Sequence, residues 1–353
     1  MKKLNKIISM SRVVKNILIS RIFNKRMPIF LSLCLTNACN LRCTYCYANI
    51  DNRFDNNPHE GFTKEEVFKI IDEFYSMGAR MVFLLGGEPL VHNNIGDIVK
   101  YITKKGMHLD ILTNGTLVEK KIEEIKTAHN ICFSLDGDEE FNDSLRGKGV
   151  FNKALSGIDI CKKNNVGARV HAVMTKGSLK QLKFLANLCK EKKIILTYSP
   201  PNYLGNSEEQ EIFKISDEEY KEFWLVYKEL KKKGYPIGNS YAAIDKVLNW
   251  PINYHDYIKP DEKFDNYKPI FCASGHTYCA VDSDGTLCNC INLGMKTGLN
   301  IREVGIKKAW EKLPDFRKNC YSCASLNTVE TSIYMQLEPS IFFDAIKYNI
   351  LIK

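Results

Sequence analysis

The sequence predicts an α/β protein whose core is a partial (β/α)6, TIM-like barrel, followed by a small β-hairpin/α domain. Apolar, β-rich runs alternate with helical patterns, hydrophobic residues make up 44% of the 353 residues, and the unusual motifs follow the ends of predicted strands. Strands that alternate with helices pair in parallel, and six repeats are too few for a closed eight-fold barrel. An open or partial barrel is therefore the better prediction.

Six strands and the helices between them can be placed in order. The strands cover residues 29–35, 81–85, 109–112, 131–135, 168–174 and 194–198. Helical patterns follow near residues 63–78, 94–105, 117–128, 150–164 and 178–191. A further helix begins at Ser216 as its N-cap and ends at Gly234. The predicted segments are a basic amphipathic helix (1–28), the core (29–200), a helical connector (201–270), the small domain (271–326) and a C-terminal helix (327–353).

The positive charge is concentrated at the N-terminus. Residues 1–30 hold eight Lys or Arg and no acid, which leaves +1 of the net +9 for the remaining 323 residues. The body is therefore not a basic nucleic-acid binder. Apolar residues recur at helical spacing between these cations, so the helix either lies on an anionic membrane surface or packs on the domain with its cations in water. No apolar run is long enough to span a membrane.

The cysteines favour metal binding over disulfides. Thirteen is an odd number, the cysteines are clustered, and no plausible signal peptide precedes them. A reducing cytoplasm fits this pattern, with peripheral membrane contact as the open alternative. The stretch "CNLRCTYCY" places Cys39, Cys43 and Cys46 in one loop after the first strand. Three thiolates suit a 4Fe–4S cluster in which one iron keeps an open position.

Three further motifs follow strands two to four. They are "GGEPL" (86–90), "TNGT" (113–116) and "SLDG" (134–137). Because the site of a parallel α/β barrel is built at the carboxyl ends of its strands, these motifs and the cysteine loop are expected on one rim. "TNGT" is also a good turn sequence and Asp136 can simply cap a loop, so structural roles stay open for both.

The cysteine spacing, with an aromatic residue before the third cysteine and "GGEP" after the next strand, resembles the radical S-adenosylmethionine superfamily over roughly residues 29–200. The resemblance implies that Cys39, Cys43 and Cys46 bind a cluster that chelates S-adenosylmethionine; a zinc site is the alternative. It also implies that Tyr45 lies against adenine and that the "GGEP" loop receives the methionyl ammonium. In the same resemblance, Ser134 and Asp136 bind ribose or the methionyl end, and Arg146 pairs with the cofactor carboxylate. The residues expected to bind this cofactor are Tyr45, Gly86, Gly87, Glu88, Pro89, Asn114, Ser134, Asp136 and Arg146.

A second cysteine group surrounds the predicted hairpin "AVDSDGTL". It resembles the twitch domain, the shortened form of the SPASM domain. The resemblance implies an auxiliary 4Fe–4S cluster held by Cys272, Cys290, Cys320 and Cys323. Cys288 can replace Cys290, and a zinc ribbon is the alternative for the whole group. The isolated Cys34, Cys132, Cys161 and Cys189 are expected to be buried small hydrophobes.

The expected chemistry is a radical oxidation. S-adenosylmethionine cleavage yields a radical that abstracts hydrogen, and a closed auxiliary cluster can take the second electron, so dehydrogenation and oxidative bond formation both fit. His171, Tyr198 and His276 are the candidate general bases. Flavodoxin or ferredoxin is the expected electron donor.

The substrate remains open among a small molecule, a lipid and a peptide. Only 38 residues precede Cys39, too few for a peptide-binding domain, so a peptide maturase is expected to need a separate leader-binding partner. The remote alternative is a non-catalytic iron–sulfur electron-transfer protein. The intact cysteine loop and "GGEP" argue against that alternative.

Overall fold

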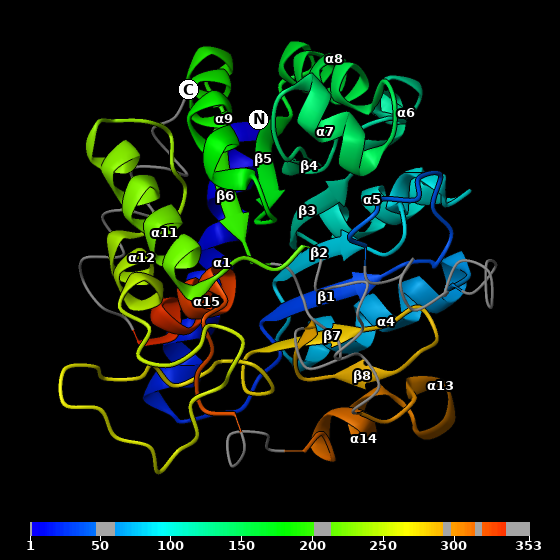
Figure 1. Ribbon diagram of the computed structural model, residues 1–353. Coiled ribbons are helices and arrows are strands. Elements are labelled where there is room, and N and C mark those ends of the chain that lie inside the picture. Colours follow the sequence, from blue (N-terminus) through cyan, green and yellow to red (C-terminus); the bar gives the residue numbers. More distant parts are fainter. Residues whose placement is uncertain (1, 47–60, 201–212, 292–297, 315–319, 337–353) are drawn as a thin grey trace. The chain divides into compact units, whose positions relative to one another are not determined.

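The computed structural model describes residues 2–46, 61–200, 213–291, 298–314 and 320–336 (Figure 1). The chain divides into two compact units. Unit 1 comprises Met1–Ser134, Asn142–Ala168 and Ser274–Pro314, whereas unit 2 comprises Leu135–Phe141, Arg169–Ala273 and Asp315–Lys353. Each unit has its own strands, helices and buried residues.

The strands of unit 1 form a sheet in the order β4-β3-β2-β1-β7-β8. They are β1 (Phe30–Cys34), β2 (Met81–Leu85), β3 (His108–Thr113), β4 (Asn130–Ser134), β7 (Tyr278–Val281) and β8 (Leu287–Cys288). Neighbours from β4 to β7 pair in parallel, and β8 pairs antiparallel with β7. All five residues of the central β1 are buried, as expected for a parallel strand with both faces covered.

In unit 1, α1 precedes the first strand, and the other helices follow strands along the chain. They are α1 (Lys2–Ile22), α4 (Lys64–Met77), the 3-10 helix η1 (Pro89–Val91), α5 (Ile95–Lys104), α6 (Val118–Ile125), α8 (Val150–Lys163), α13 (Ile301–Val304) and α14 (Ile306–Glu311). α7 (Glu139–Arg146) begins in unit 2 and ends in unit 1.

α4 shows how local sequence sets a helix. Thr63 caps its start in a capping box with Glu66, and Gly78 ends it with a φ of 119°, which favours glycine. Its buried side chains recur at three- and four-residue spacing: Val67, Ile70, Ile71 and Phe74. The caps therefore fix where the chain leaves the helix and enters β2.

Unit 2 combines a parallel strand pair with helices. Its elements are β5 (Gly167–Val173, from Arg169 onward), β6 (Ile195–Ser199), α9 (Ser178–Lys192), α11 (Asp217–Lys232), α12 (Tyr241–Leu248) and α15 (Leu326–Gln336). α11 buries an aromatic face that includes Tyr220 and Trp224, and the Tyr220 hydroxyl donates to the Ala324 carbonyl at 2.7 Å. The Ser240 N–H and hydroxyl both donate to the buried Glu330, which joins the start of α12 to α15.

The predicted α/β class is confirmed. Each of the six predicted core strands agrees with the structure within one residue at either end. Helices α7, α12, α13 and α14 were not predicted. The predicted 327–353 helix corresponds to α15 up to Gln336, and residues 337–353 lie outside the described residues.

The hairpin at 278–288 differs from the prediction. It was assigned to a separate domain at 271–326, but β7 pairs in parallel with β1, with Phe30 opposite Tyr278. The hairpin therefore extends the unit 1 sheet. The turn sequence predicts the two short strands because it is local, whereas pairing between residues so far apart in the chain leaves no local signal.

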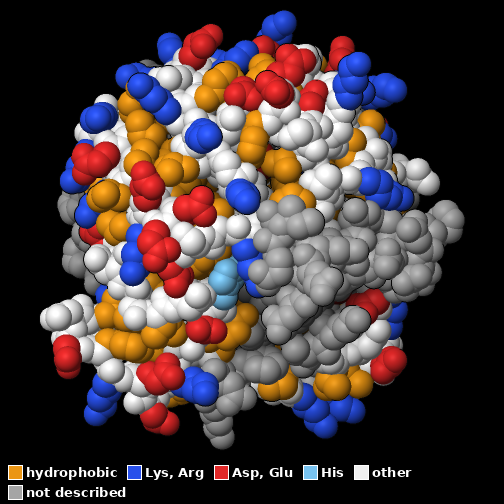
Figure 2. Space-filling view, viewed as in Figure 1, with side chains coloured by type: hydrophobic (Ala, Val, Ile, Leu, Met, Phe, Trp, Pro, Cys, Tyr) orange, Lys and Arg blue, Asp and Glu red, His pale blue; other side chains and the backbone are white. Residues whose placement is uncertain are grey.

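The described surface carries mixed charges. Figure 2 shows Lys and Arg interspersed with Asp and Glu on the visible face, as the small net charge of the body predicts. Among the helices of the described residues, none is long and apolar enough to cross a membrane.

Candidate active site at the carboxyl edge of unit 1

The entry to the cysteine loop is held against the "GGEP" loop by backbone hydrogen bonds. Gly87 N–H donates to the Thr36 carbonyl at 2.7 Å, and Glu88 N–H donates to the Ala38 carbonyl at 2.9 Å. A Cβ at position 87 would lie 2.3 Å from the Ala38 oxygen, and one at Gly86, whose φ is 145°, would lie 2.5 Å from the Thr36 oxygen. The two glycines therefore let the loops after β1 and β2 touch.

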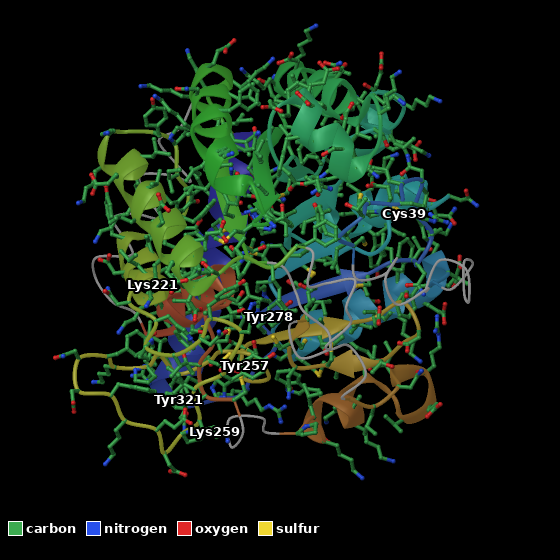
Figure 3. The ribbon with its side chains drawn as sticks, viewed as in Figure 1. Cys39, Lys221, Tyr257, Lys259, Tyr278 and Tyr321 are labelled. Atoms are coloured by element: carbon green, nitrogen blue, oxygen red, sulfur yellow. The ribbon has the colours of Figure 1, made fainter. Side chains whose placement is uncertain are left out.

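The three thiols lie on one short loop, and all are half-buried. Leu41 N–H donates to the Cys39 Sγ at 3.4 Å, and Cys46 N–H donates to the Cys43 carbonyl at 3.1 Å. Burial raises the pKa of the Cys39 thiol to about 12, so a bound metal would be needed to hold it as a thiolate. Figure 3 labels Cys39, which follows the carboxyl end of β1.

These features fit a cluster in their donor chemistry: three sulfur donors, a backbone N–H directed at one sulfur, and partial exposure. Among the described residues, no three His, Cys, Asp or Glu side chains are gathered as ligands of a single metal ion. The fit therefore rests on the donor set and its loop.

Glu88 is buried and accepts three hydrogen bonds. They come from the Thr113 hydroxyl at 2.7 Å, Asn114 N–H at 2.8 Å and Leu90 N–H at 3.0 Å. Burial raises the pKa of Glu88 to about 7, although these donors favour the charged form. The sequence predicts a Glu88 carboxylate that receives an ammonium group, whereas in this structure the carboxylate joins the end of β2 to the end of β3. Pro89 is buried at the start of η1, for which Glu88 is the N-cap.

The "TNGT" turn reaches the cysteine loop. The Asn114 side-chain amide donates to the Asn40 side-chain carbonyl at 2.9 Å, and the Asn40 amide donates to the Thr116 hydroxyl at 2.8 Å. The structural role left open for "TNGT" is therefore real, since it fixes Asn40 between Cys39 and Cys43. The sequence analysis assigned no role to Asn40 or Thr113. Their positions inside the cysteine motif and inside "TNGT" could have indicated that they contact the site.

Tyr45 and Arg146 contact each other. The Arg146 guanidinium donates to the Tyr45 hydroxyl and lies 5.4 Å from the centre of its ring. Thr44 N–H donates to the Leu145 carbonyl at 2.9 Å, so the end of α7 is tied to the cysteine loop. Here the Arg146 side chain, predicted to pair with a cofactor carboxylate, positions the aromatic residue beside the third cysteine.

Ser134 and Asp136 have different surroundings. Ser134 ends β4 and is half-buried. Asp136, in unit 2, is completely buried, and its carboxylate accepts a hydrogen bond from Val173 N–H at 3.0 Å. Asp136 therefore secures the end of β5, which supports the capping alternative over direct ribose binding.

Two of the three candidate bases, His171 and Tyr198, lie on the paired strands β5 and β6 of unit 2. The His171 ring nitrogens lie 3.0 Å from the Thr197 hydroxyl and 3.1 Å from the Ser199 hydroxyl. Tyr198 is fully buried, and burial raises the pKa of its phenol well above the usual value of 10, which disfavours a base.

His276, the third candidate base, belongs to unit 1 and lies just before β7. Its carbonyl accepts from Met27 N–H at 2.9 Å, just before β1. Because β7 runs parallel to β1, residues that precede β7 lie at the amino edge, away from the cysteine loop. His276 therefore lies at the amino edge of the unit 1 sheet, and its role as a base stays a prediction.

The second cysteine group is divided between the units. Cys272, Cys320 and Cys323 belong to unit 2, where Cys272 N–H donates to the Tyr321 carbonyl at 3.0 Å. Cys290 follows β8 in unit 1. Cys288 is fully buried within β8 and packs with Cys34 and Ala280, its thiol 3.5 Å from the Ala280 carbonyl. Cys290 is also buried, at 7% exposure, so burial does not decide between the two as a ligand.

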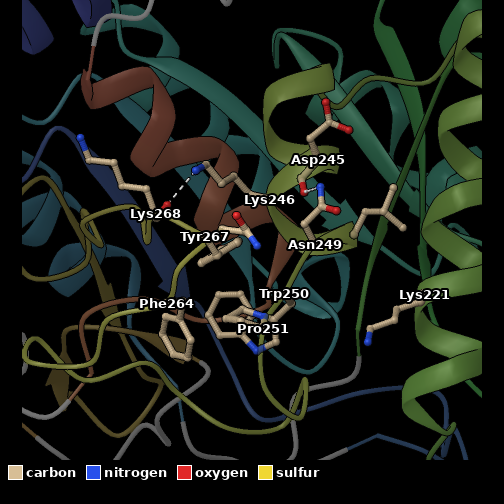
Figure 4. Close-up of a pocket in the computed structure, with 11 residues that line it drawn as sticks. Lys221, Asp245, Lys246, Asn249, Trp250, Pro251, Phe264, Tyr267 and Lys268 are labelled. Atoms are coloured by element: carbon tan, nitrogen blue, oxygen red, sulfur yellow. Dashed lines mark hydrogen bonds between the residues drawn. The ribbon is translucent and has the colours of Figure 1, made fainter.

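Unit 2 also contains a cavity of about 540 Å³ (Figure 4). Its lining includes three cations, one acid and three aromatic rings: Lys221, Lys246, Lys268, Asp245, Trp250, Phe264 and Tyr267. Trp250 and Tyr267 meet edge to face at 5.7 Å, and the Tyr267 hydroxyl is buried without a hydrogen-bond partner among the described residues. No site residue predicted from the sequence lines this cavity, whose groups suit an anionic ligand with a ring system.

Comparisons with known proteins agree with the geometry. Fe-coproporphyrin III synthase of Methanosarcina barkeri is 29% identical over 236 residues, which cover 64% of this chain and 57% of that relative, less than two thirds of it. AdoMet-dependent heme synthase of the same organism is 27% identical over 303 residues, or 82% of this chain and 84% of the relative. The structure of Streptococcus suis SuiB bound to precursor peptide SuiA has a similar fold, with a TM-score of 0.64 at 18% identity over 86% of this chain and 70% of SuiB.

The family comparison covers the segment that holds the clamped cysteine loop. Residues 33–189 match the model of the radical SAM superfamily, where SAM is S-adenosylmethionine. That segment contains the cysteine motif, "GGEP" and "TNGT" on one edge of the sheet. This segment of the chain is therefore similar to the radical SAM superfamily.

Proposed function

We propose that this protein is a radical SAM enzyme that oxidatively modifies an organic substrate. One observation carries the proposal: the three-cysteine loop is clamped at the carboxyl edge by the "GGEP" glycines, and Asn40 inside it is bonded to "TNGT". A loop that merely connected β1 to α4 would not need two glycines in backbone contact with it. The arrangement holds the loop that carries the three thiols at this edge of the sheet.

The residues divide the work between holding and orienting. Cys39, Cys43 and Cys46 would hold a 4Fe–4S cluster, and the Leu41 N–H would donate to a cluster sulfur. Arg146 would orient Tyr45 toward the adenine. Glu88 and Asn114 would keep the neighbouring loop ends in register, and the Gly86 and Gly87 carbonyls would be open to the methionyl ammonium. When bound, the cluster and S-adenosylmethionine supply a radical that abstracts hydrogen from a C–H bond.

A second cluster held by Cys272, Cys290, Cys320 and Cys323 is the further part of the proposal. Its support is the set of four cysteines and the backbone bond that brings Cys272 beside the Cys320–Cys323 segment. Four protein ligands would leave no open iron, so its role would be to accept the second electron of the oxidation. A flavodoxin or ferredoxin would supply the first electron.

A tetrapyrrole is the substrate class to test first. The heme synthase of M. barkeri aligns with most of this chain, whereas the likeness to SuiB is one of fold. A tetrapyrrole also carries carboxylates and a flat ring system, which suit the lysines and aromatic rings of the unit 2 cavity. A peptide, modified with help from a separate leader-binding partner, is the second candidate, supported by the SuiB–SuiA structure.

The experiment measures 5′-deoxyadenosine after anaerobic reconstitution with iron and sulfide. Reconstituted protein, S-adenosylmethionine and a strong reductant should yield 5′-deoxyadenosine, and iron-coproporphyrin III should raise the yield if a tetrapyrrole is the substrate. Glu88→Gln serves as a partial-loss variant and Leu225→Ser, on the exposed side of α11, as the neutral control. Absence of 5′-deoxyadenosine from protein that holds its iron would contradict the proposal.

A further inference from the structure

Helix α1 exposes apolar residues on its outer face although its inner face is already packed on unit 1. It buries polar side chains, since Ser9, Asn16 and Ser20 are 2%, 8% and 1% exposed. It exposes large apolar ones: Leu4 (59%), Ile7 (43%), Ile8 (42%), Leu18 (38%) and Ile22 (70%). A surface helix normally turns its apolar stripe toward the core. The outward stripe therefore needs an explanation outside the packing of unit 1.

Polar contacts explain how the inner face is held. Ser9 Oγ lies 3.0 Å from His108 Nδ1, and the Asn16 amide donates to the Gly78 carbonyl at 2.8 Å. The Lys6 ammonium donates to the Asn130 side chain at 3.0 Å. Val13 and Ile17 add buried apolar contacts to the same face. The outer apolar residues are thus not needed to attach the helix.

The outward apolar residues share one face of the helix, in two groups (Leu4, Ile7 and Ile8, then Leu18 and Ile22) that Ser11 and Lys15 separate. At 3.6 residues per turn, Leu4, Ile7, Ile8, Leu18 and Ile22 fall within an arc of about 100°. Arg12 and Arg21 lie on its two flanks and Lys15 within it, and all three are exposed. This is the pattern of a helix that lies in the plane of a lipid interface.

The charge distribution selects the occupant. Residues 1–50 contain no acid, and eight Lys or Arg lie in the first 30 residues. Pairing this stripe with that of a second copy would bring two sets of cations together, whereas an anionic lipid surface neutralises them. An apolar stripe this exposed also marks a contact site rather than ordinary surface.

We propose that α1 binds an anionic membrane surface while it stays packed on unit 1. Its contacts with Gly78, Gly106 and His108 lie before β2 and at the start of β3, which is the amino edge of the sheet. The cysteine loop follows β1 at the carboxyl edge of the same unit. Membrane binding through α1 would therefore leave the catalytic edge open to substrate and electron donor from the aqueous side. This inference goes beyond the proposed function and does not depend on it.

The test is co-sedimentation of the full-length protein with vesicles. Vesicles made of two thirds phosphatidylcholine and one third phosphatidylglycerol should bind the protein. Vesicles of phosphatidylcholine alone should bind it far less. The variant Leu4→Ser/Ile8→Ser/Ile22→Ser should bind at least about tenfold more weakly because the stripe is lost. The variant Lys15→Gln/Arg21→Gln should bind these vesicles at least about tenfold more weakly. Binding of the wild type should fall as the salt concentration rises to about 1 M.

Matched controls keep the result decisive. Leu225→Ser removes an exposed apolar side chain of α11, 51% exposed, and should bind like the wild type. All variants should keep wild-type circular dichroism and molar mass in solution. Full-length protein that does not sediment with anionic vesicles would overturn the inference. A stripe variant that binds anionic vesicles like the wild type would also overturn it. If the protein is a dimer that does not bind vesicles and the stripe variant is a monomer, the stripe joins two copies, which would overturn the inference too.

Discussion

Replacing Gly87 by Ala tests the clamp on the cysteine loop. The new Cβ would lie 2.3 Å from the Ala38 oxygen and 2.5 Å from the Asn37 oxygen, and both are backbone atoms that cannot rotate away. The loops must separate by at least 0.7 Å to reach the 3.0 Å that real Cβ contacts observe. The Gly87–Thr36 and Glu88–Ala38 hydrogen bonds, at 2.7 and 2.9 Å, would be stretched or broken.

The magnitude follows from these contacts. Overpacking at a tight site costs about 1–3 kcal/mol, and each lost hydrogen bond costs about 1 kcal/mol. The free energy of unfolding should therefore fall by roughly 2–4 kcal/mol if relaxation is partial. The larger effect should be on the site, because the displaced segment leads directly into Cys39. Iron bound after anaerobic reconstitution and 5′-deoxyadenosine formation should both drop several-fold while the far-ultraviolet spectrum stays near wild type.

Gly149→Ala is the matched control. Gly149 has a φ of 79°, and a Cβ added there would meet no atom within 4 Å, so alanine adds backbone strain of about 1–2 kcal/mol without a clash. It should lose stability but keep its iron. Gly87→Ala protein that binds iron and cleaves S-adenosylmethionine at the wild-type rate would refute the clamp. Equal iron loss in both variants would attribute the effect to general instability and refute it too.

Three further predictions concern other parts of the molecule. Thr113→Val should lower the free energy of unfolding by about 1–3 kcal/mol in urea, because buried Glu88 loses one of its donors. Thr103→Val should change it less, because the half-buried Thr103 hydroxyl donates to the Val99 carbonyl within α5 and to no buried carboxylate. Burial, with the nearby His108 and Lys6, lowers the pKa of His129 to about 4, although Asp110 opposes the shift. The stability that neutral His129 contributes should therefore be present above pH 6.5 and be lost as the pH falls toward 4. His129→Asn should make the melting temperature depend less on pH over that range. With the variant Cys320→Ala/Cys323→Ala, a substrate deuterated at its reacting carbon should still transfer deuterium to 5′-deoxyadenosine, but the yield of oxidised product should fall. If the folded variant forms product at the wild-type rate, the second cysteine group has no electron-transfer role.

Local features of the fold were predictable from the sequence. The strand from Met81 to Leu85 is a short apolar run, and α4 has its cap at Thr63 and its stop at Gly78, so each can be read from its own short segment. The parallel pairing of Tyr278 with Phe30 could not be read in this way. That pairing places His276 at the amino edge of the sheet, a position that its own short segment does not indicate.

The same limit applies to the candidate site. The spacing of Cys39, Cys43 and Cys46 is a local pattern that predicts their shared loop. The partners of Glu88 depend on β3 lying beside β2, and the partner of Arg146 depends on α7, an element that was not predicted. A sequence pattern therefore indicates which residues matter, whereas the neighbours that occupy their polar atoms depend on the tertiary fold.

The most direct test of the central claim compares wild-type protein with Cys39→Ala/Cys43→Ala/Cys46→Ala. Both are reconstituted anaerobically and assayed for iron and for 5′-deoxyadenosine formed from S-adenosylmethionine under a strong reductant. The wild type should hold about eight irons as two clusters of four, and the variant should lose about half of them. The variant should form no 5′-deoxyadenosine. A variant that still forms 5′-deoxyadenosine at the wild-type rate would contradict the assignment of these three cysteines to a radical SAM cluster.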